Sequence, residues 1–139
     1  MVFIDSNVVQ VALAQVLQSA VLHAFAVLAY CFMPDHLHLL AAGQLESADL
    51  NAFAKDVKQR IGYHAPRPRA ATIWQKGYYD RILRDDEEIL TVAKYILANP
   101  VRKGLVQEPR DYPFSGSAVW SWDQLLEMWQ AERDRFGTA

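Results

Sequence analysis

The apolar positions of the chain change period several times, and each change marks a predicted element. Between residues 7 and 23 they recur every three to four positions, which predicts an amphipathic helix capped by Asp5-Ser6. Phe25–Met33 is dense in apolar and aromatic residues, which predicts a strand. His36–Ala42 predicts a second strand, and because Pro34-Asp35 forms a turn between the two, we expect an antiparallel hairpin.

The second half of the chain begins with a helix and a strand. Ser47 is expected to open a helix that runs to about Tyr63, because its apolar residues repeat at helical spacing. Ala65–Ala71, with two prolines, is expected to be a loop. A third strand is predicted over Tyr78–Arg84.

The acidic run Asp85–Glu88 predicts the start of another helix, because negative charge is favourable at a helix N-terminus. This helix should stop near Ala98, since Pro100 cannot continue it. Residues 105–121 show no period and are expected to be irregular, and a last amphipathic helix holds Leu125–Trp129. Helices that alternate with hairpin strands favour an α+β domain, with one antiparallel sheet and helices on one face.

Composition narrows the class of protein. With 139 residues the chain supports a single domain, 1–139. The apolar stretch from Val8 to Met33 is interrupted by polar residues and follows no basic segment, so neither a membrane span nor a signal peptide is expected. Cys31 is the only cysteine, which excludes an internal disulfide and favours a reducing compartment. We therefore expect a cytoplasmic protein, with Cys31 as a small buried apolar residue.

The net charge of −2 does not by itself indicate a nucleic-acid partner, but the charges are unevenly distributed. Residues 1–54 contain no lysine or arginine, and most of the basic residues lie between Lys55 and Lys103. Such a stretch is compatible with contacts to a phosphate backbone. Considered alone, it is more typical of solvated helix and loop faces, so the charge pattern permits DNA binding without indicating it.

His36-Leu37-His38 is the most specific chemical feature. Alternate side chains on a strand share a face, so His36 and His38 should point together, about 7 Å apart along the strand. Two imidazoles so placed can bind a metal ion, although a His-x-His pair alone is more often two ordinary polar residues. No second histidine or cysteine pair completes a zinc site, so any further ligand must come from another segment.

The helix before Pro100 offers that further ligand. Its apolar positions form an arc, and Tyr95 and Asn99, four residues apart, lie together beside this arc. If the helix packs on the sheet, both side chains should lie at the boundary between core and solvent. Considered alone, each is an ordinary residue: a boundary tyrosine and the last residue before a proline.

Four segments resemble the REP-associated tyrosine transposases, a family related to the single-strand transposases of small insertion sequences. They are Tyr30–Leu40 (YCFMPDHLHLL), Trp74–Asp85 (WQKGYYDRILRD), Tyr95–Val106 (YILANPVRKGLV) and Asp111–Ser115 (DYPFS). They occur in the family's order and cover most of residues 25–117. The resemblance implies a ferredoxin-like sheet. The family usually has an additional first strand, and because only Met1–Ile4 precede the first predicted helix, we expect that strand to be missing or shortened here.

The resemblance also implies a site. His36 and His38 would hold a divalent ion, Mg²⁺ or Mn²⁺, with Asn99 as third ligand, and Tyr95 would be the nucleophile. Tyrosine, with an ordinary pKa of about 10, needs positioning and nearby positive charge to attack a phosphodiester. The expected product is a 5′-phosphotyrosine and a free 3′-hydroxyl, so that strands are cut and rejoined without ATP. Asp35 stands where asparagine is common in the family.

The implied partner is single-stranded or hairpin DNA. Candidate contacts are basic residues of two segments, together with one aromatic residue for base stacking: Lys55, Lys58, Arg60, Trp74, Lys76, Arg81 and Arg84. Insertion-sequence relatives pair as dimers and REP-associated ones need not, so a monomer and a homodimer both remain open. Two other functions also remain open: a domesticated relative that binds hairpins without cutting, and a metal-dependent hydrolase that uses His-x-His on a small substrate.

Overall fold

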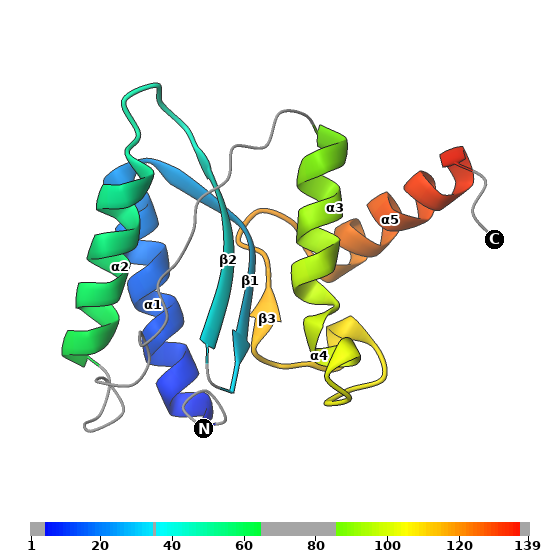
Figure 1. The fold of residues 1–139 in the computed structure, drawn as a ribbon, viewed down its shortest axis with the longest axis horizontal. Helices are drawn as coiled ribbons and strands as arrows, with labels where there is room; N and C mark the ends of the chain where they lie inside the picture. The colour runs from blue at the N-terminus through cyan, green and yellow to red at the C-terminus, as the bar shows by residue number, and fades with distance from the viewer. Residues whose placement is uncertain (1–4, 35, 65–85, 137–139) are drawn as a thin grey trace.

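The structure is a computed structural model that describes residues 5–34, 36–64 and 86–136. Its sheet is a hairpin with one short addition. Strand β1 (Phe25–Met33) pairs antiparallel with β2 (His36–Gly43), as predicted. A third strand, β3 (Ser115–Gly116), pairs antiparallel with the other edge of β1, so that the strand order is β2-β1-β3. Strand β1 is therefore central, with β2 and β3 at its sides (Figure 1).

Strand β3 corrects the expectation that residues 105–121 are irregular. This segment also contains a short 3₁₀ helix, η2 (Pro109–Asp111). Main-chain hydrogen bonds join it to β1 both before and after β3. The Phe32 amide donates to the Phe114 carbonyl over 2.9 Å, and the Ala118 amide donates to the Val27 carbonyl over 3.1 Å. The buried Tyr112 hydroxyl donates to the Phe32 carbonyl over 2.6 Å. These long-range bonds, rather than any local period, place the strand.

A β-bulge in β1 changes which side chains face which layer. The register of the hairpin shifts between Val27 and Ala29, which leaves one additional residue on β1. Before the bulge, Phe25 and Val27 pack in one hydrophobic cluster. After it, Ala29, Cys31 and Met33 pack in the other cluster. The odd-numbered residues of β1 thus change face at the bulge, which an almost wholly apolar strand does not reveal in its sequence.

Helices α1 (Ser6–His23) and α2 (Leu50–His64) cover one face of the sheet (Figure 1). The Asp5 carboxylate caps α1 by accepting from the Asn7 amide over 2.8 Å, as predicted. Helix α2 begins three residues later than expected, because Asp49 rather than Ser47 accepts from the amide of Ala52. The apolar faces of both helices pack in one hydrophobic cluster with Phe32, which is fully buried.

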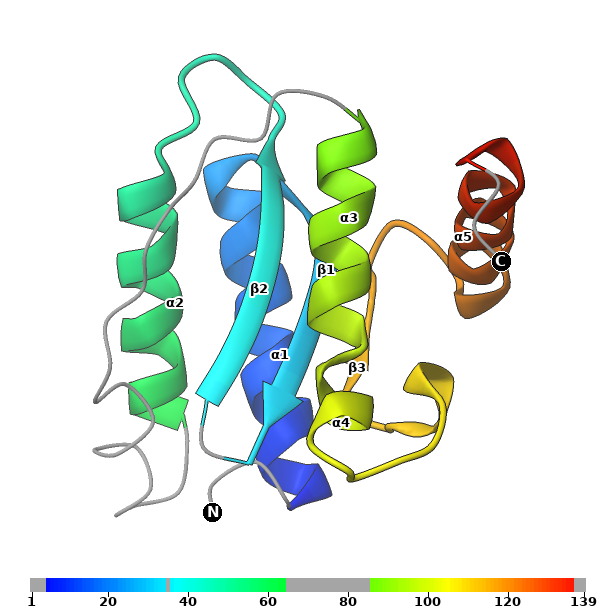
Figure 2. The same ribbon diagram turned by 45° about the vertical axis from the view of Figure 1, so that its right-hand side comes forward.

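The opposite face is covered by α3 (Asp86–Leu97) (Figure 2), and buried residues of the other long C-terminal helix, α5 (Trp122–Phe136), belong to the same hydrophobic cluster. The α+β class with an antiparallel sheet is confirmed. The helices were expected on one face, whereas the structure has them on both, because the bulged strand buries apolar side chains on each side. None of the described helices is long and apolar enough to cross a membrane.

Helix α3 ends at Leu97, close to the predicted stop, but the chain turns directly into the short helix α4 (Asn99–Arg102). Pro100 lies in the first turn of α4, where its missing amide hydrogen is not needed. The same proline removes the amide that would have bonded the Ile96 carbonyl, so the main-chain ladder breaks at this point. Asn99 is consequently the first residue of a new turn rather than the last residue of α3.

Candidate active site

His36 and His38 lie on the sheet face covered by α3. Their cross-strand partners are Met33 and Cys31, which belong to the cluster that contains the apolar residues of α3. Leu37 packs against the opposite cluster, with α1 and α2. The alternation expected for this strand is therefore confirmed: the histidines share one face and the intervening leucine lies on the other.

The two imidazoles converge. His36 Nε2 lies 2.8 Å from His38 Nε2, and the ring planes are close to perpendicular, at 84°. Ligand atoms about 2.1 Å from an octahedral ion stand roughly 3 Å apart at adjacent corners. The separation of the ring nitrogens therefore fits two neighbouring ligands of one small ion. Both rings would then carry their proton on Nδ1.

A third ligand from an acidic, cysteine or histidine side chain is not found in the described part of the chain, where no group of three such residues could hold a metal ion. A metal ion held by the two imidazoles would need a neutral oxygen or a residue outside the described ranges as a further ligand. Asn99, which is buried, carries such an oxygen. Carbonyl and amide oxygens suit hard divalent ions.

Tyr95 and Asn99 are joined by Arg102, the last residue of α4. Arg102 Nη2 donates to the Tyr95 carbonyl over 2.8 Å and to Asn99 Oδ1 over 3.1 Å. The Arg102 guanidinium carbon also lies 3.9 Å from the centre of the Tyr95 ring, a cation–π contact. Tyr95 is 63% exposed, and no hydrogen bond joins its hydroxyl to another residue of the described chain. Its hydroxyl is thus open to a substrate.

Helix α3 carries Tyr95 and contacts both β1 and β2 (Figure 2). Cys31 is the cross-strand partner of His38. Burial raises the pKa of the Cys31 thiol to about 12, and the positive charge of Arg102 opposes this rise. The expectation that Cys31 is a small buried residue is confirmed.

Sequence reasoning missed the role of Arg102, which it counted only among the basic residues. The available signal was its position, three residues after Asn99 in a new helical turn and beyond the end of α3. A basic side chain at this position can bond the unpaired carbonyls at a helix C-terminus. Here it bonds the carbonyl of Tyr95 itself.

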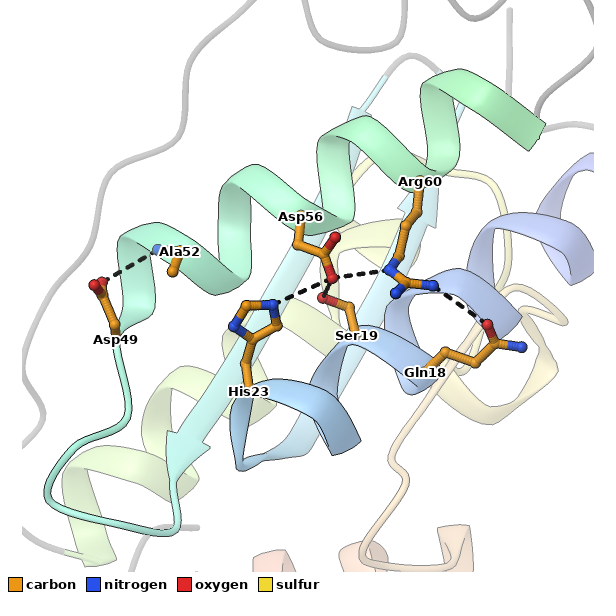
Figure 3. Close-up of polar contacts among 7 residues, drawn as sticks. All are labelled: Gln18, Ser19, His23, Asp49, Ala52, Asp56 and Arg60. Carbon is orange, nitrogen blue, oxygen red and sulfur yellow. Dashed lines mark hydrogen bonds and ion pairs between the residues drawn. The ribbon is translucent and has the colours of Figure 1, made fainter.

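The basic residues predicted on α2 belong to the other layer. Lys55 is exposed, Lys58 is half-buried, and Arg60 forms an ion pair with Asp56, Nε to Oδ2 at 2.8 Å. Figure 3 shows that Arg60 also reaches Gln18 of α1, over 3.5 Å. These contacts give Arg60 a structural role between α1 and α2. Because α2 covers the face opposite the histidines, its lysines lie in a different layer from the histidine pair.

The remaining predicted DNA contacts lie outside the described residues. They are Trp74, Lys76, Arg81 and Arg84, and the predicted strand Tyr78–Arg84 falls there as well. Asp35, at the turn before the histidines, is also outside. Their roles stay predictions.

Comparisons with known proteins identify relatives of this chain. A putative REP-associated tyrosine transposase of Haemophilus influenzae is 30% identical over 107 residues, which cover 67% of this chain and 59% of that protein. A REP-associated tyrosine transposase of Escherichia coli is 24% identical over 91 residues, covering 66% and 53%. The chain thus spans between half and two thirds of the length of these relatives. No family model matches the sequence.

A solved structure supports the fold. The structure of a REP-associated tyrosine transposase bound to a REP hairpin aligns with a TM-score of 0.67 and 21% identity, over 79% of this chain and 65% of that one. The solved structure shows the fold, and the sequence is similar to that of the REP-associated tyrosine transposases. These relatives confirm the resemblance stated from its motifs.

Proposed function

We propose that the chain cuts and rejoins single-stranded or hairpin DNA, with Tyr95 as nucleophile and a divalent ion held by His36 and His38. The observation that carries this proposal is the 2.8 Å separation of the two Nε2 atoms on the sheet face against which the Tyr95 helix packs. Asn99 supplies the third ligand through Oδ1, which has two lone pairs and uses one for Arg102. Bound there, Mg²⁺ or Mn²⁺ would neutralise charge on the scissile phosphate and orient it.

Each residue has a defined part in the proposed reaction. The Tyr95 oxygen attacks phosphorus and forms the new phosphodiester to the 5′ side, while the 3′ oxygen leaves and takes up a proton. The exposed Tyr95 ring can meet a strand that approaches from solvent. Because the phosphotyrosine keeps the energy of the cleaved bond, a 3′-hydroxyl can attack it in the reverse direction and rejoin the strands. The histidines would serve as ligands of the ion.

The test is the formation of a covalent adduct. Purified protein is incubated with a labelled DNA hairpin that carries a single-stranded flank, with Mn²⁺ or Mg²⁺, and separated under denaturing conditions. We expect wild type to retain the label and Tyr95→Phe to retain none. Tyr63→Phe is the matched control, because Tyr63 is 85% exposed and lies on α2, in the other layer. It should form adduct at the wild-type rate.

The outcomes separate this proposal from the two other functions. Salt-sensitive hairpin binding without adduct, unaffected by Tyr95→Phe, would replace it with a relative that binds DNA without cutting it. Activity on a small phosphorylated substrate that survives Tyr95→Phe would replace it with a metal-dependent hydrolase. Adduct formation by Tyr95→Phe at the wild-type level would assign the nucleophile to another residue.

A further inference from the structure

Arg102 makes three contacts that converge on the two predicted groups of α3 and α4. Its Nη2 atom donates to the main-chain carbonyl of Tyr95 and to the side chain of Asn99. The central carbon of its guanidinium lies 3.9 Å from the centre of the Tyr95 ring. A guanidinium is planar and rigid, so two hydrogen bonds and a ring contact together restrict its orientation.

These contacts restrict the orientation of the Tyr95 side chain, which the fold of the main chain alone does not fix. Tyr95 is an exposed side chain, and an exposed aromatic ring changes rotamer readily unless a neighbour holds it. Asn99 is buried, but its amide can turn about its last torsion, and the bond from Arg102 selects the position of Oδ1. One side chain therefore sets the direction of the phenol and of the amide oxygen together.

We propose that Arg102 is a positioning residue for strand cleavage, which holds the Tyr95 ring and the Asn99 amide as one unit. The proposal rests on the proposed function, in which Tyr95 is the nucleophile. Misplacement of a reacting group by about 1 Å costs roughly a hundredfold in rate. Loss of the clamp should consequently lower the rate of the chemical step, whereas binding of DNA should change only by the effect of one positive charge.

The contact itself is tested without DNA or metal. In the NMR spectrum of the wild-type protein, the ring current of Tyr95 should shift the side-chain protons of Arg102 upfield. The shift should disappear in Tyr95→Leu. Wild-type protein whose Arg102 protons have unshifted resonances would overturn the inference, whatever the activity.

The role in cleavage is tested by single-turnover adduct formation at saturating hairpin, beside the dissociation constant of the hairpin. Arg102→Ala should lower the maximal rate roughly a hundredfold. Arg102→Lys keeps the charge but loses the planar fork, so it should recover no more than about a tenth of the wild-type rate. Lys103→Ala is the matched control, because it removes the same charge from the next, exposed residue. It should weaken binding as much as Arg102→Ala and leave the maximal rate unchanged.

The outcomes distinguish the inference from the function on which it depends. An active wild type with Arg102→Lys at full rate would reduce Arg102 to a source of charge. A rate loss in Arg102→Ala that merely follows the unfolded fraction, measured by circular dichroism at the assay temperature, would reduce it to a helix cap. A folded wild type with shifted Arg102 protons but no adduct would overturn the proposed function, and the positioning role with it.

Discussion

Two polar clusters, one on each face of the sheet, both contain histidine but arrange it differently. Between α1 and α2, Asp56 Oδ2 accepts from Ser19 Oγ over 2.7 Å and from Arg60 Nε over 2.8 Å, and lies 3.2 Å from His23 Nε2 (Figure 3). There a carboxylate meets a hydroxyl, an imidazole and a guanidinium. On the other face, His36 and His38 turn like groups toward each other. The first cluster is built around an anion, whereas two facing imidazole nitrogens are suited to hold an added cation.

The difference explains why a serine, a histidine and an aspartate in contact do not form a catalytic centre here. Ser19 is buried and donates directly to Asp56, and His23 contacts the same carboxylate oxygen, so the histidine does not stand between them. A nucleophilic serine needs the histidine as its base and the acid behind it. The Asp56 cluster therefore joins two helices, and the chemistry is expected at the histidine pair.

The largest expected effect tests whether the histidine pair binds a metal ion. His38→Ala should abolish the rise in melting temperature caused by Mn²⁺, because ligand binding stabilises only through a competent site. It should also lower the adduct rate by roughly a thousandfold or more, since a cation contributes several kcal/mol to transition-state stabilisation. Melting curves with and without Mn²⁺, together with the adduct assay, measure both.

The matched control for this substitution is His64→Ala, at the exposed end of α2. It should keep the Mn²⁺ effect and the adduct rate. If His38→Ala is stabilised by Mn²⁺ as strongly as wild type, the histidine pair is not the metal site and the contrast between the two clusters loses its basis.

An intermediate effect tests whether the Asp56 cluster stabilises the fold. Asp56→Asn should lower the free energy of unfolding by about 1.5–3 kcal/mol, the usual range for hydrogen bonds to a charged group. Urea unfolding monitored by circular dichroism measures the change. The adduct rate of the folded protein and its response to Mn²⁺ should stay at wild-type values, because Asp56 lies in the other layer.

Asp49→Asn is the corresponding control. It is the same substitution on the same helix, but asparagine caps a helix as well as aspartate does. Its unfolding free energy should stay within about 0.5 kcal/mol of wild type. Equal losses of unfolding free energy in the two variants would show that the Asp56 cluster contributes no more to stability than the Asp49 cap. A loss of the response to Mn²⁺ in Asp56→Asn would show that the two clusters depend on each other.

The same contrast shows what the sequence can and cannot predict. The elements β1, β2, α1 and α3 follow local signals: alternation, helical periodicity, a cap and a proline. The convergence of the histidines needed only the two-residue period of a strand. Strand β3 has two residues and no period, and it is positioned by the Tyr112 hydroxyl and by main-chain bonds from residues far away in the chain.

The contacts of Arg102 within the site could not be predicted from local sequence patterns, because they too depend on a departure from regular structure. A uniform α-helix would align Tyr95 and Asn99, but the break at Pro100 starts a new turn, and Arg102 then folds back over both. The bulge of β1 likewise has no signature in an apolar strand, although it decides which layer Cys31 and Met33 face. Periodicity predicts regular elements, and the departures from regularity define this site.

The smallest expected effect concerns pH and the Asp56 cluster. The hydrogen bond from Ser19, followed by the contacts of Arg60 and His23, holds the pKa of Asp56 below its ordinary value of 3.8. A carboxyl whose pKa is lower in the folded than in the unfolded state stabilises the fold above the unfolded value and loses that contribution as the pH falls through the folded one. The stability difference between wild type and Asp56→Asn should therefore narrow below about pH 4.

Urea unfolding of both proteins at pH 7, 5, 4 and 3 measures this narrowing. The paired design matters because every other carboxylate titrates in both proteins and cancels from the difference. Asp49→Asn, measured alongside, should differ little from wild type at each pH, since Asp49 accepts one exposed hydrogen bond whereas Asp56 receives three donors. A difference between wild type and Asp56→Asn that stays constant down to pH 3 would show that the shape of the side chain, rather than its charge, joins α1 to α2. The Asp56 cluster would then not depend on charge, and its contrast with the histidine pair, which is proposed to bind an ion, would not hold.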